Sequence, residues 1–187
     1  MAIKIPAKII GLKEEGILTA LKRGHYVYNP LQASMISKES IANVLLGPSY
    51  VSLDYALYFY DLIPEAIHRV SSVTTKRSKS FQTPYGLFAY QQIPKALFNL
   101  ALEIHPCSWG NFLIASKEKA LCDKVFLTRG AELRSREAML VFLEEDLRMD
   151  LDALSLMRVE VFEEFFQKSK SKKIKILKKL IEEFSSD

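Results

Sequence analysis

The sequence of 187 residues contains few of the residues that build metal centres or disulfide frameworks. Its two cysteines, Cys107 and Cys122, lack metal-site spacing, and we expect free thiols, a disulfide between them being the alternative. The three histidines, His25, His68 and His105, are scattered, with no pair four residues apart on a helix. The sequence therefore predicts no metal site.

Glycine is also scarce, and this bears on catalysis. Seven glycines are spread singly, so the sequence has no glycine-rich phosphate loop and no G-x-S-x-G nucleophile motif. The acidic runs 144–146 and 163–164 are typical of solvated helix faces rather than of a catalytic carboxylate pair. We expect a protein that is not an enzyme and needs no cofactor.

Long apolar runs are missing as well. The longest, such as residues 55–60, are far too short to span a bilayer. The first 16 residues lack the apolar core of a signal peptide. The expectation is a cytoplasmic protein without a membrane partner.

What is present is a modest excess of basic charge, unevenly placed. Lys plus Arg number 26 and Asp plus Glu number 22, a net charge of +4. Residues 1–130 carry 15 basic and 9 acidic side chains, residues 131–167 carry 4 and 10, and residues 168–187 carry 7 and 3. A basic front of this kind favours an anionic partner for the first 130 residues.

The N-terminal third has helix and hairpin signals. We expect a short helix at 6–15 and a β-hairpin in which the runs 17–21 and 25–28 flank a glycine turn. Ser37 is a predicted N-cap of a helix through Leu46, and Ser52 is expected to cap a second helix that ends before residue 64.

The middle of the chain reads as strands and one helix. Strands are expected at 67–75, 79–83, 87–90 and 112–115, with the turn at 84–86 closing a hairpin. Ser116 is a predicted N-cap of a helix through residue 127.

From residue 135 onward the apolar spacing becomes helical, with helices expected near 139–147, 159–166 and 174–184. The last is strongly amphipathic. We expect its apolar face to complete the core and its lysines to be solvated, a membrane-surface helix being the alternative. Strands followed by helices predict the α+β class: a small mixed or antiparallel sheet with helices and a helical C-terminal tail.

Two basic segments are candidates for nucleic-acid contact. Cations at a hairpin tip can contact phosphates or enter a minor groove, and interleaved hydroxyl and cationic side chains donate hydrogen bonds to oxyanions. The alternatives are an ordinary solvated turn and a polar loop between strands. The hairpin residues are Lys22, Arg23, His25 and Tyr26, and the second segment comprises Arg69, Thr74, Thr75, Lys76, Arg77, Ser78 and Lys79.

Five short sequence motifs, occurring in this order along the chain, resemble the AbiEi family, the antitoxin and transcriptional-regulator half of type IV toxin–antitoxin (abortive infection) systems. The resemblance runs from about Gly16 to Gly130 and more loosely through the helical tail. The motifs are GPSYVSLDYAL at 47–57, LIPE at 62–65, VTTKRS at 73–78, FQTPYGLFAY at 81–90 and IASKEKAL at 114–121.

The resemblance implies a winged helix-turn-helix that binds operator DNA of its own operon, and an α+β domain needed to counteract a nucleotidyltransferase toxin. Residues 17–28 match the wing hairpin of the family. Residues 74–78 match a motif of the family's second domain that combines hydroxyl side chains with an arginine. Sixteen residues precede Ile17, room for one helix, so we expect a shortened winged helix in which Lys13 contacts phosphate.

The expected organisation is therefore a partial winged helix at 1–33, an AbiEi-like α+β domain at 34–130 and a helical segment at 131–187. Two other functions stay open. One is a protein-interaction module that binds the toxin or a second copy of the chain and has lost operator binding. The other is an enzyme acting on nucleic acid, favoured by the basic surface alone.

Overall fold

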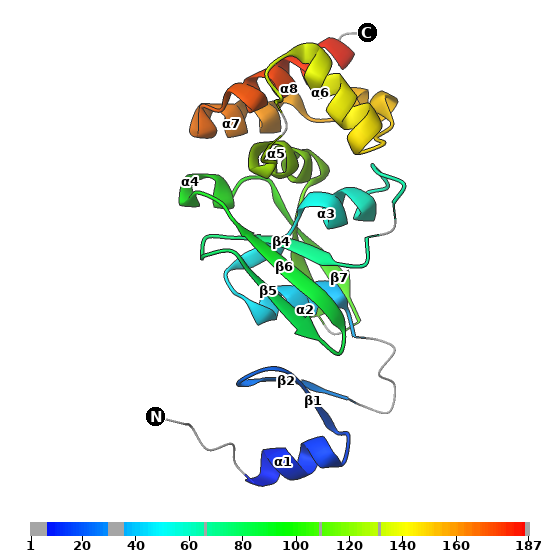
Figure 1. Ribbon diagram of the computed structural model, residues 1–187, viewed down its shortest axis with the longest axis vertical. Helices are drawn as coiled ribbons and strands as arrows, with labels where there is room; N and C mark the ends of the chain where they lie inside the picture. The colour runs from blue at the N-terminus through cyan, green and yellow to red at the C-terminus, as the bar shows by residue number, and fades with distance from the viewer. Residues whose placement is uncertain (1–6, 30–35, 66, 109, 131, 186–187) are drawn as a thin grey trace.

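The computed structural model describes residues 7–29, 36–65, 67–108, 110–130 and 132–185, and it has an α+β fold, which confirms the expected class (Figure 1). The N-terminal elements are helix α1 (Ala7–Glu14) and the antiparallel hairpin β1 (Leu18–Lys22) and β2 (His25–Tyr28). Gly16 follows α1 with a positive φ of 73°, a conformation that glycine adopts without strain. The helix and hairpin expected at this end are therefore confirmed.

The centre of the molecule is one mixed sheet of six strands in the order β5-β6-β4-β3-β8-β7. The pairs β4–β6 and β3–β8 are parallel, and the other neighbours are antiparallel. The strands are β3 (Ser49–Val51), β4 (Val70–Thr74), β5 (Lys79–Thr83), β6 (Gly86–Gln92), β7 (Leu102–Cys107) and β8 (Gly110–Ala115).

Helices cover both faces of this sheet. Helix α2 (Lys38–Leu45) packs on one face, where the Tyr90 hydroxyl donates to the Ala42 carbonyl at 2.6 Å. The helices α3 (Leu53–Phe59) and α5 (Lys117–Leu127) lie on the opposite side of the strands from α2 (Figure 1). The short α4 (Lys95–Phe98) follows β6.

Helix α2 is tied to the sheet through one amide side chain. Asn43 Nδ2 donates to the Leu113 carbonyl at 3.2 Å, and the Leu113 amide donates back to Asn43 Oδ1 at 2.6 Å. Strand β3 has three residues and pairs with β8 at a single position, Val51 with Ile114. The Asn43 amide thus bonds the backbone of β8 beside this short pairing, satisfying groups that would otherwise be unpaired.

The C-terminal helices stack beyond α5 (Figure 1). They are α6 (Arg136–Val141), which continues into the π-helical turn η2 (Phe142–Asp146), the 3-10 helix η3 (Leu151–Leu156), α7 (Val159–Ser169) and α8 (Lys172–Phe184). The apolar face of α8, with Leu177 and Ile181 fully buried, joins a core that extends to Leu21 in the hairpin. The expectation that α8 completes the core is confirmed. None of the helices in the described ranges is long and apolar enough to cross a membrane.

Several local expectations are corrected. The strand predicted at 67–75 covers only Val70–Thr74, and β3, α4 and β7 were not predicted. Ser52 precedes α3 but makes no side-chain capping bond: its hydroxyl donates to Asp123 at 2.9 Å, and the Tyr55 amide in the first turn donates to Ser71 Oγ at 3.2 Å. Ser37 and Ser116 accept capping bonds as predicted, and Ser135 does the same for α6.

Candidate nucleic-acid interface

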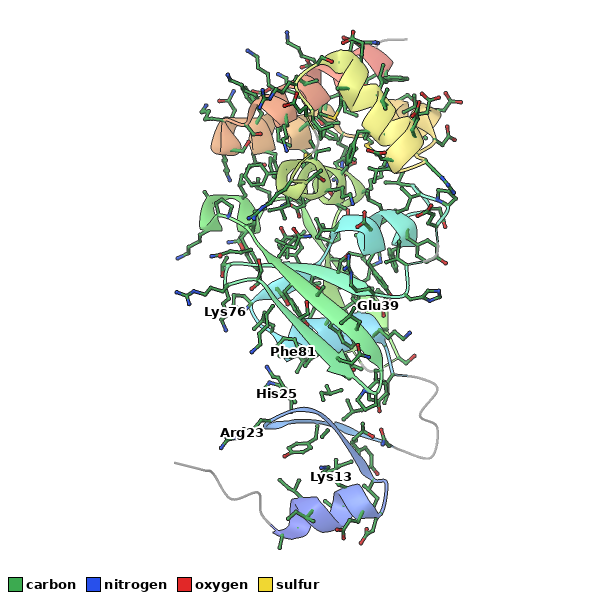
Figure 2. The ribbon with its side chains drawn as sticks, in the orientation of Figure 1. Lys13, Arg23, His25, Glu39, Lys76 and Phe81 are labelled. Carbon is green, nitrogen blue, oxygen red and sulfur yellow. The ribbon has the colours of Figure 1, made fainter. Side chains whose placement is uncertain are left out.

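The hairpin tip and the 74–79 turn, separated by some fifty residues in sequence, meet at one aromatic ring. Lys22 Nζ lies 5.2 Å from the centroid of the Phe81 ring, and Lys79 Nζ lies 5.0 Å from it. Figure 2 shows Phe81 with Lys76, His25 and Arg23 along the same side of the molecule, where the hairpin faces the sheet. Strand β1 also contacts β5 directly. The hairpin tip and the lysines at 76 and 79 therefore form one surface.

Two of these lysines are anchored at the end of helix α2. Lys22 Nζ donates to the Leu45 carbonyl, and Lys76 Nζ donates to the Gly47 carbonyl. Carbonyls at a helix C-terminus carry partial negative charge and lack partners within the helix, so ammonium groups stabilise them. The first role of Lys22 and Lys76 is thus structural, and their remaining N–H donors stay available for an anion.

The ammonium groups of Lys22, Lys76 and Lys79 repel one another. The pKa of Lys22 is lowered, first by burial of its ammonium and then by the positive charges of Lys79 and Lys76. No ion pair among the described residues involves any of the three. A phosphate bound here would relieve this repulsion, and the surface is therefore suited to an anion.

Arginines flank the lysines on both segments. Arg23 at the hairpin turn and Arg77 in the 74–79 turn are exposed, and within the described ranges neither takes part in an ion pair. His25 Nδ1 lies 3.4 Å from the Arg23 carbonyl, and Tyr26 is half-buried in β2. We name the set Lys22, Arg23, Lys76, Arg77 and Lys79 the cationic face.

One of the two threonines of the second segment, Thr74, is not an exposed phosphate donor. Thr74 is completely buried, and its hydroxyl donates to the Pro48 carbonyl at 2.7 Å while accepting the Lys76 amide. The expectation for Thr74 is therefore wrong: its side chain fixes the strand end against the Gly47–Pro48 segment. Thr75 is half-buried, and its carbonyl accepts from Gln92 Nε2 at 3.3 Å.

Lys13 lies apart from the cationic face. It is exposed near the end of α1, and Figure 2 places it below the hairpin rather than beside Phe81. Helix α1 buries none of its residues and contacts the rest of the chain mainly through β1. A helix held this loosely positions Lys13 poorly for a specific contact.

Arg69 and Ser78 belong to a different part of the surface. They line a cavity of about 510 Å³ on the side of the sheet covered by α3 and α5, together with Lys124 and Arg129 from the end of α5. The Ser78 hydroxyl accepts the Gln92 amide at 3.0 Å and retains its own proton for donation. Sequence reasoning missed Lys124 and Arg129, because nothing local connects residues 124–129 with the 69–78 region.

A buried ionic network was also missed. Lys119 and Asp123 pair one helical turn apart on α5, both with fully buried side chains. Tyr50 and Ser52 each donate to Asp123 Oδ2 at 2.9 Å. Burial raises the pKa of Asp123, opposed by Lys119 and the two hydroxyl donors. Because these groups are sealed from solvent, they hold α5 onto β3 rather than bind a ligand.

No protein-family model matches this chain, and no curated protein matches it significantly.

Proposed function

We propose that this chain is a non-enzymatic, AbiEi-like antitoxin and transcriptional regulator that binds DNA of its own operon through the cationic face. The observation that carries the proposal is the meeting of Lys22 and Lys79 on the two sides of the hairpin–sheet junction at Phe81. The cations of the hairpin tip lie beside those of the second basic segment, and together they are suited to contact successive phosphates of a DNA backbone.

Under this proposal the cations have different tasks. Lys22, bonded to the last carbonyl of α2, and Lys76, bonded to the Gly47 carbonyl just beyond the helix, act as fixed point charges. Arg23 and Arg77 are exposed and can present two N–H donors each to one phosphate. Such contacts position a protein on DNA and supply affinity, but they carry no base sequence information by themselves.

The test is DNA binding across a salt series. Fluorescence anisotropy with the duplex upstream of the gene is compared for the native protein and for Arg23→Gln/Arg77→Gln. We expect weaker binding and a salt slope smaller by about one unit for each lost phosphate contact. The matched control is Arg134→Gln/Arg148→Gln, which removes the same charge from exposed positions in the helical segment. Unchanged binding by the Arg23/Arg77 variant, or no binding at low salt, contradicts the proposal.

The antitoxin part is tested separately by growth. The neighbouring gene product, a nucleotidyltransferase under this proposal, is expressed alone and together with this chain. Rescue of growth supports antitoxin action, and persistence of rescue in the Arg23→Gln/Arg77→Gln variant would show that neutralisation does not need DNA binding. Continued toxicity with the native chain present contradicts it.

A second candidate, a protein-interaction module, is favoured by helix α1. This helix buries no residue, and its Ile10 side chain is 47 % exposed. An apolar side chain on an otherwise unpacked helix suits a partner protein or a second copy of the chain. Light scattering after size exclusion, with and without the neighbouring gene product, tests this. A complex weakened by Ile10→Glu supports it, whereas a monomer that ignores that product contradicts it.

A further inference from the structure

A polar groove crosses the sheet face opposite helix α2. It consists of two adjoining cavities of about 510 and 470 Å³, which share Leu53, Asp54, Arg69, Ser78 and Gln91. Because the two cavities have these walls in common, they form one continuous depression between the 69–80 region and helices α3 and α5. Each is large enough for a ligand the size of a nucleotide.

The groove has an excess of positive charge. In the part of the chain that the structure describes, Asp54 is the one carboxylate that lines either cavity, and its Oδ1 lies 2.5 Å from Lys124 Nζ. That ion pair is about three-quarters buried and leaves Asp54 neutralised. Arg69 and Arg129 are exposed at the same cavity and enter no ion pair in the described part of the chain. Two guanidinium groups are thus free to meet an anion.

The helix end beside Arg129 does not repel an anion as strongly as a bare helix C-terminus would. The Thr128 hydroxyl donates to the Lys124 carbonyl at 2.7 Å, and Lys173 Nζ donates to the Thr128 carbonyl at 2.7 Å. The carbonyls of Lys124 in α5 and of Thr128 just beyond it are therefore occupied, and Lys173 adds a positive charge beside Thr128. The Ser78 hydroxyl supplies a neutral donor on the opposite wall.

We propose that this groove is a second phosphate-binding site, which adjoins the cationic face at Lys79, and in which Arg69 and Arg129 hold the oxygens of a phosphate group. Arginine matches this chemistry because its planar fork donates two parallel hydrogen bonds to one phosphate. The phosphate belongs either to the backbone of a single nucleic-acid strand or to a free nucleotide.

The walls favour the strand. Among the described residues, Tyr90 is the one aromatic residue that lines either cavity, and it is almost fully buried with its hydroxyl bonded to the Ala42 carbonyl on the other face of the sheet. The described walls of the groove therefore offer no ring on which a base can stack, and a ligand gains its affinity from phosphates. A strand places successive phosphates along the two joined cavities, whereas a mononucleotide fills only one.

The experiment uses the full chain and two probes, a fluorescein-labelled oligothymidylate of 12 nucleotides and ATP. Binding at low salt is compared for the native protein, Arg69→Gln/Arg129→Gln and the charge-matched control Arg134→Gln/Arg148→Gln. We expect the groove variant to bind the oligonucleotide roughly tenfold or more weakly, with a salt slope reduced by about 0.7 for each lost phosphate. The control is expected to bind nearly as the native protein does.

The two probes distinguish the sources of the phosphate. Oligonucleotide binding that millimolar ATP does not displace identifies a strand, and displacement by ATP identifies a nucleotide site. The proposal is overturned if neither probe binds at low salt, or if the groove variant and the control behave alike. Circular dichroism melting verifies that the variants remain folded, which is expected because both arginines are exposed.

This site does not depend on the proposed function. The Arg23→Gln/Arg77→Gln variant is expected to lose duplex binding and keep oligonucleotide binding, and the groove variant is expected to do the reverse. Loss of both activities in both variants would overturn the separate groove.

Discussion

Lys119 and Asp123 form an ion pair inside the protein, between helix α5 and strand β3, with neither side chain exposed to solvent. Lys119 Nζ also donates to the Tyr50 hydroxyl at 2.8 Å, and Tyr50 donates onward to Asp123. Each charge in this closed set is thus compensated by the other members. Buried pairs of this kind contribute little net stability, but they are sensitive to the loss of one partner.

We predict that Asp123→Asn destabilises the fold by about 3–5 kcal/mol, because it leaves the Lys119 ammonium buried without its counter-charge. The double variant Lys119→Met/Asp123→Leu removes both charges and is expected to recover much of that loss. Urea unfolding followed by circular dichroism measures both. A cost below about 1 kcal/mol for Asp123→Asn would show that water reaches the pair.

Because of Glu118, the neighbour of Lys119 on helix α5, we predict that the free energy of unfolding falls at acidic pH. Burial acts to raise the pKa of Glu118, but hydrogen bonds from Arg158, from the helix backbone and from Ser116 outweigh it and lower the pKa to about 2. The two nitrogens of Arg158 lie 3.1 and 2.8 Å from the Glu118 oxygens.

Because the folded pKa lies below the usual 4.5, the ionised carboxylate favours the folded state. This contribution is present above pH 4.5 and is lost as the pH falls toward 2. We expect it to be about 1–2 kcal/mol after solvent screening, since Arg158 is half exposed. Unfolding free energies measured between pH 6 and 2.5 should fall less steeply for Glu118→Gln. Equal slopes would contradict the assignment.

Strand β4 offers a matched pair of hydroxyls. Thr74→Val removes the bond to the Pro48 carbonyl and leaves the partly buried Lys76 amide without its acceptor, so it should cost about 1–2 kcal/mol. The Ser72 hydroxyl is buried and has no partner among the described residues, so Ser72→Ala should be nearly neutral or stabilising. Thermal melting of the two variants measures the difference. A reversed order would indicate that Ser72 is bonded in solution.

Helix α8 is predicted to be part of the cooperative fold. Leu177→Ala should cost about 2–5 kcal/mol, because Leu177 is completely buried. Leu156→Ala, at a side chain that is 75 % exposed, serves as the control and should change stability by less than about 0.5 kcal/mol. Denaturant unfolding should show a single transition for both. A separate, earlier transition in Leu177→Ala would mean that the C-terminal helices unfold on their own.

The sequence predicted those helices and hairpins whose ends are determined by turn or capping residues close to them in the chain. The hairpin at Gly24 and the caps at Ser37 and Ser116 follow from turn and capping chemistry and are confirmed. Strand β7 was missed because Pro106 argues against a strand, although residues 102–105 alternate between apolar and polar side chains. It lies at the edge of the sheet, where a missing N–H is tolerated.

Long-range relationships were beyond local reasoning. Thr74 looked like a phosphate donor because its neighbours are cationic, and only its packing against Pro48 shows that the hydroxyl is occupied. The meeting of Lys22 with Lys79 depends on how β1 packs against β5. The groove needs Arg69 and Arg129, sixty residues apart in sequence, at one cavity. Pairings at this distance are set by the topology of the sheet rather than by spacing.

The amide of Asn43 has a consequence for the hairpin. It registers helix α2 to strand β8 through two reciprocal bonds, so the helix cannot slide along the sheet without breaking both. The Leu45 and Gly47 carbonyls, which accept hydrogen bonds from Lys22 and Lys76, are thereby held in a fixed position relative to the sheet. The Asn43 side chain of α2 therefore contributes to how far the hairpin stands from β5, together with the bond from the Tyr85 hydroxyl to Asn29 Oδ1 at 2.7 Å, and so to the spacing of the charges that a partner would meet.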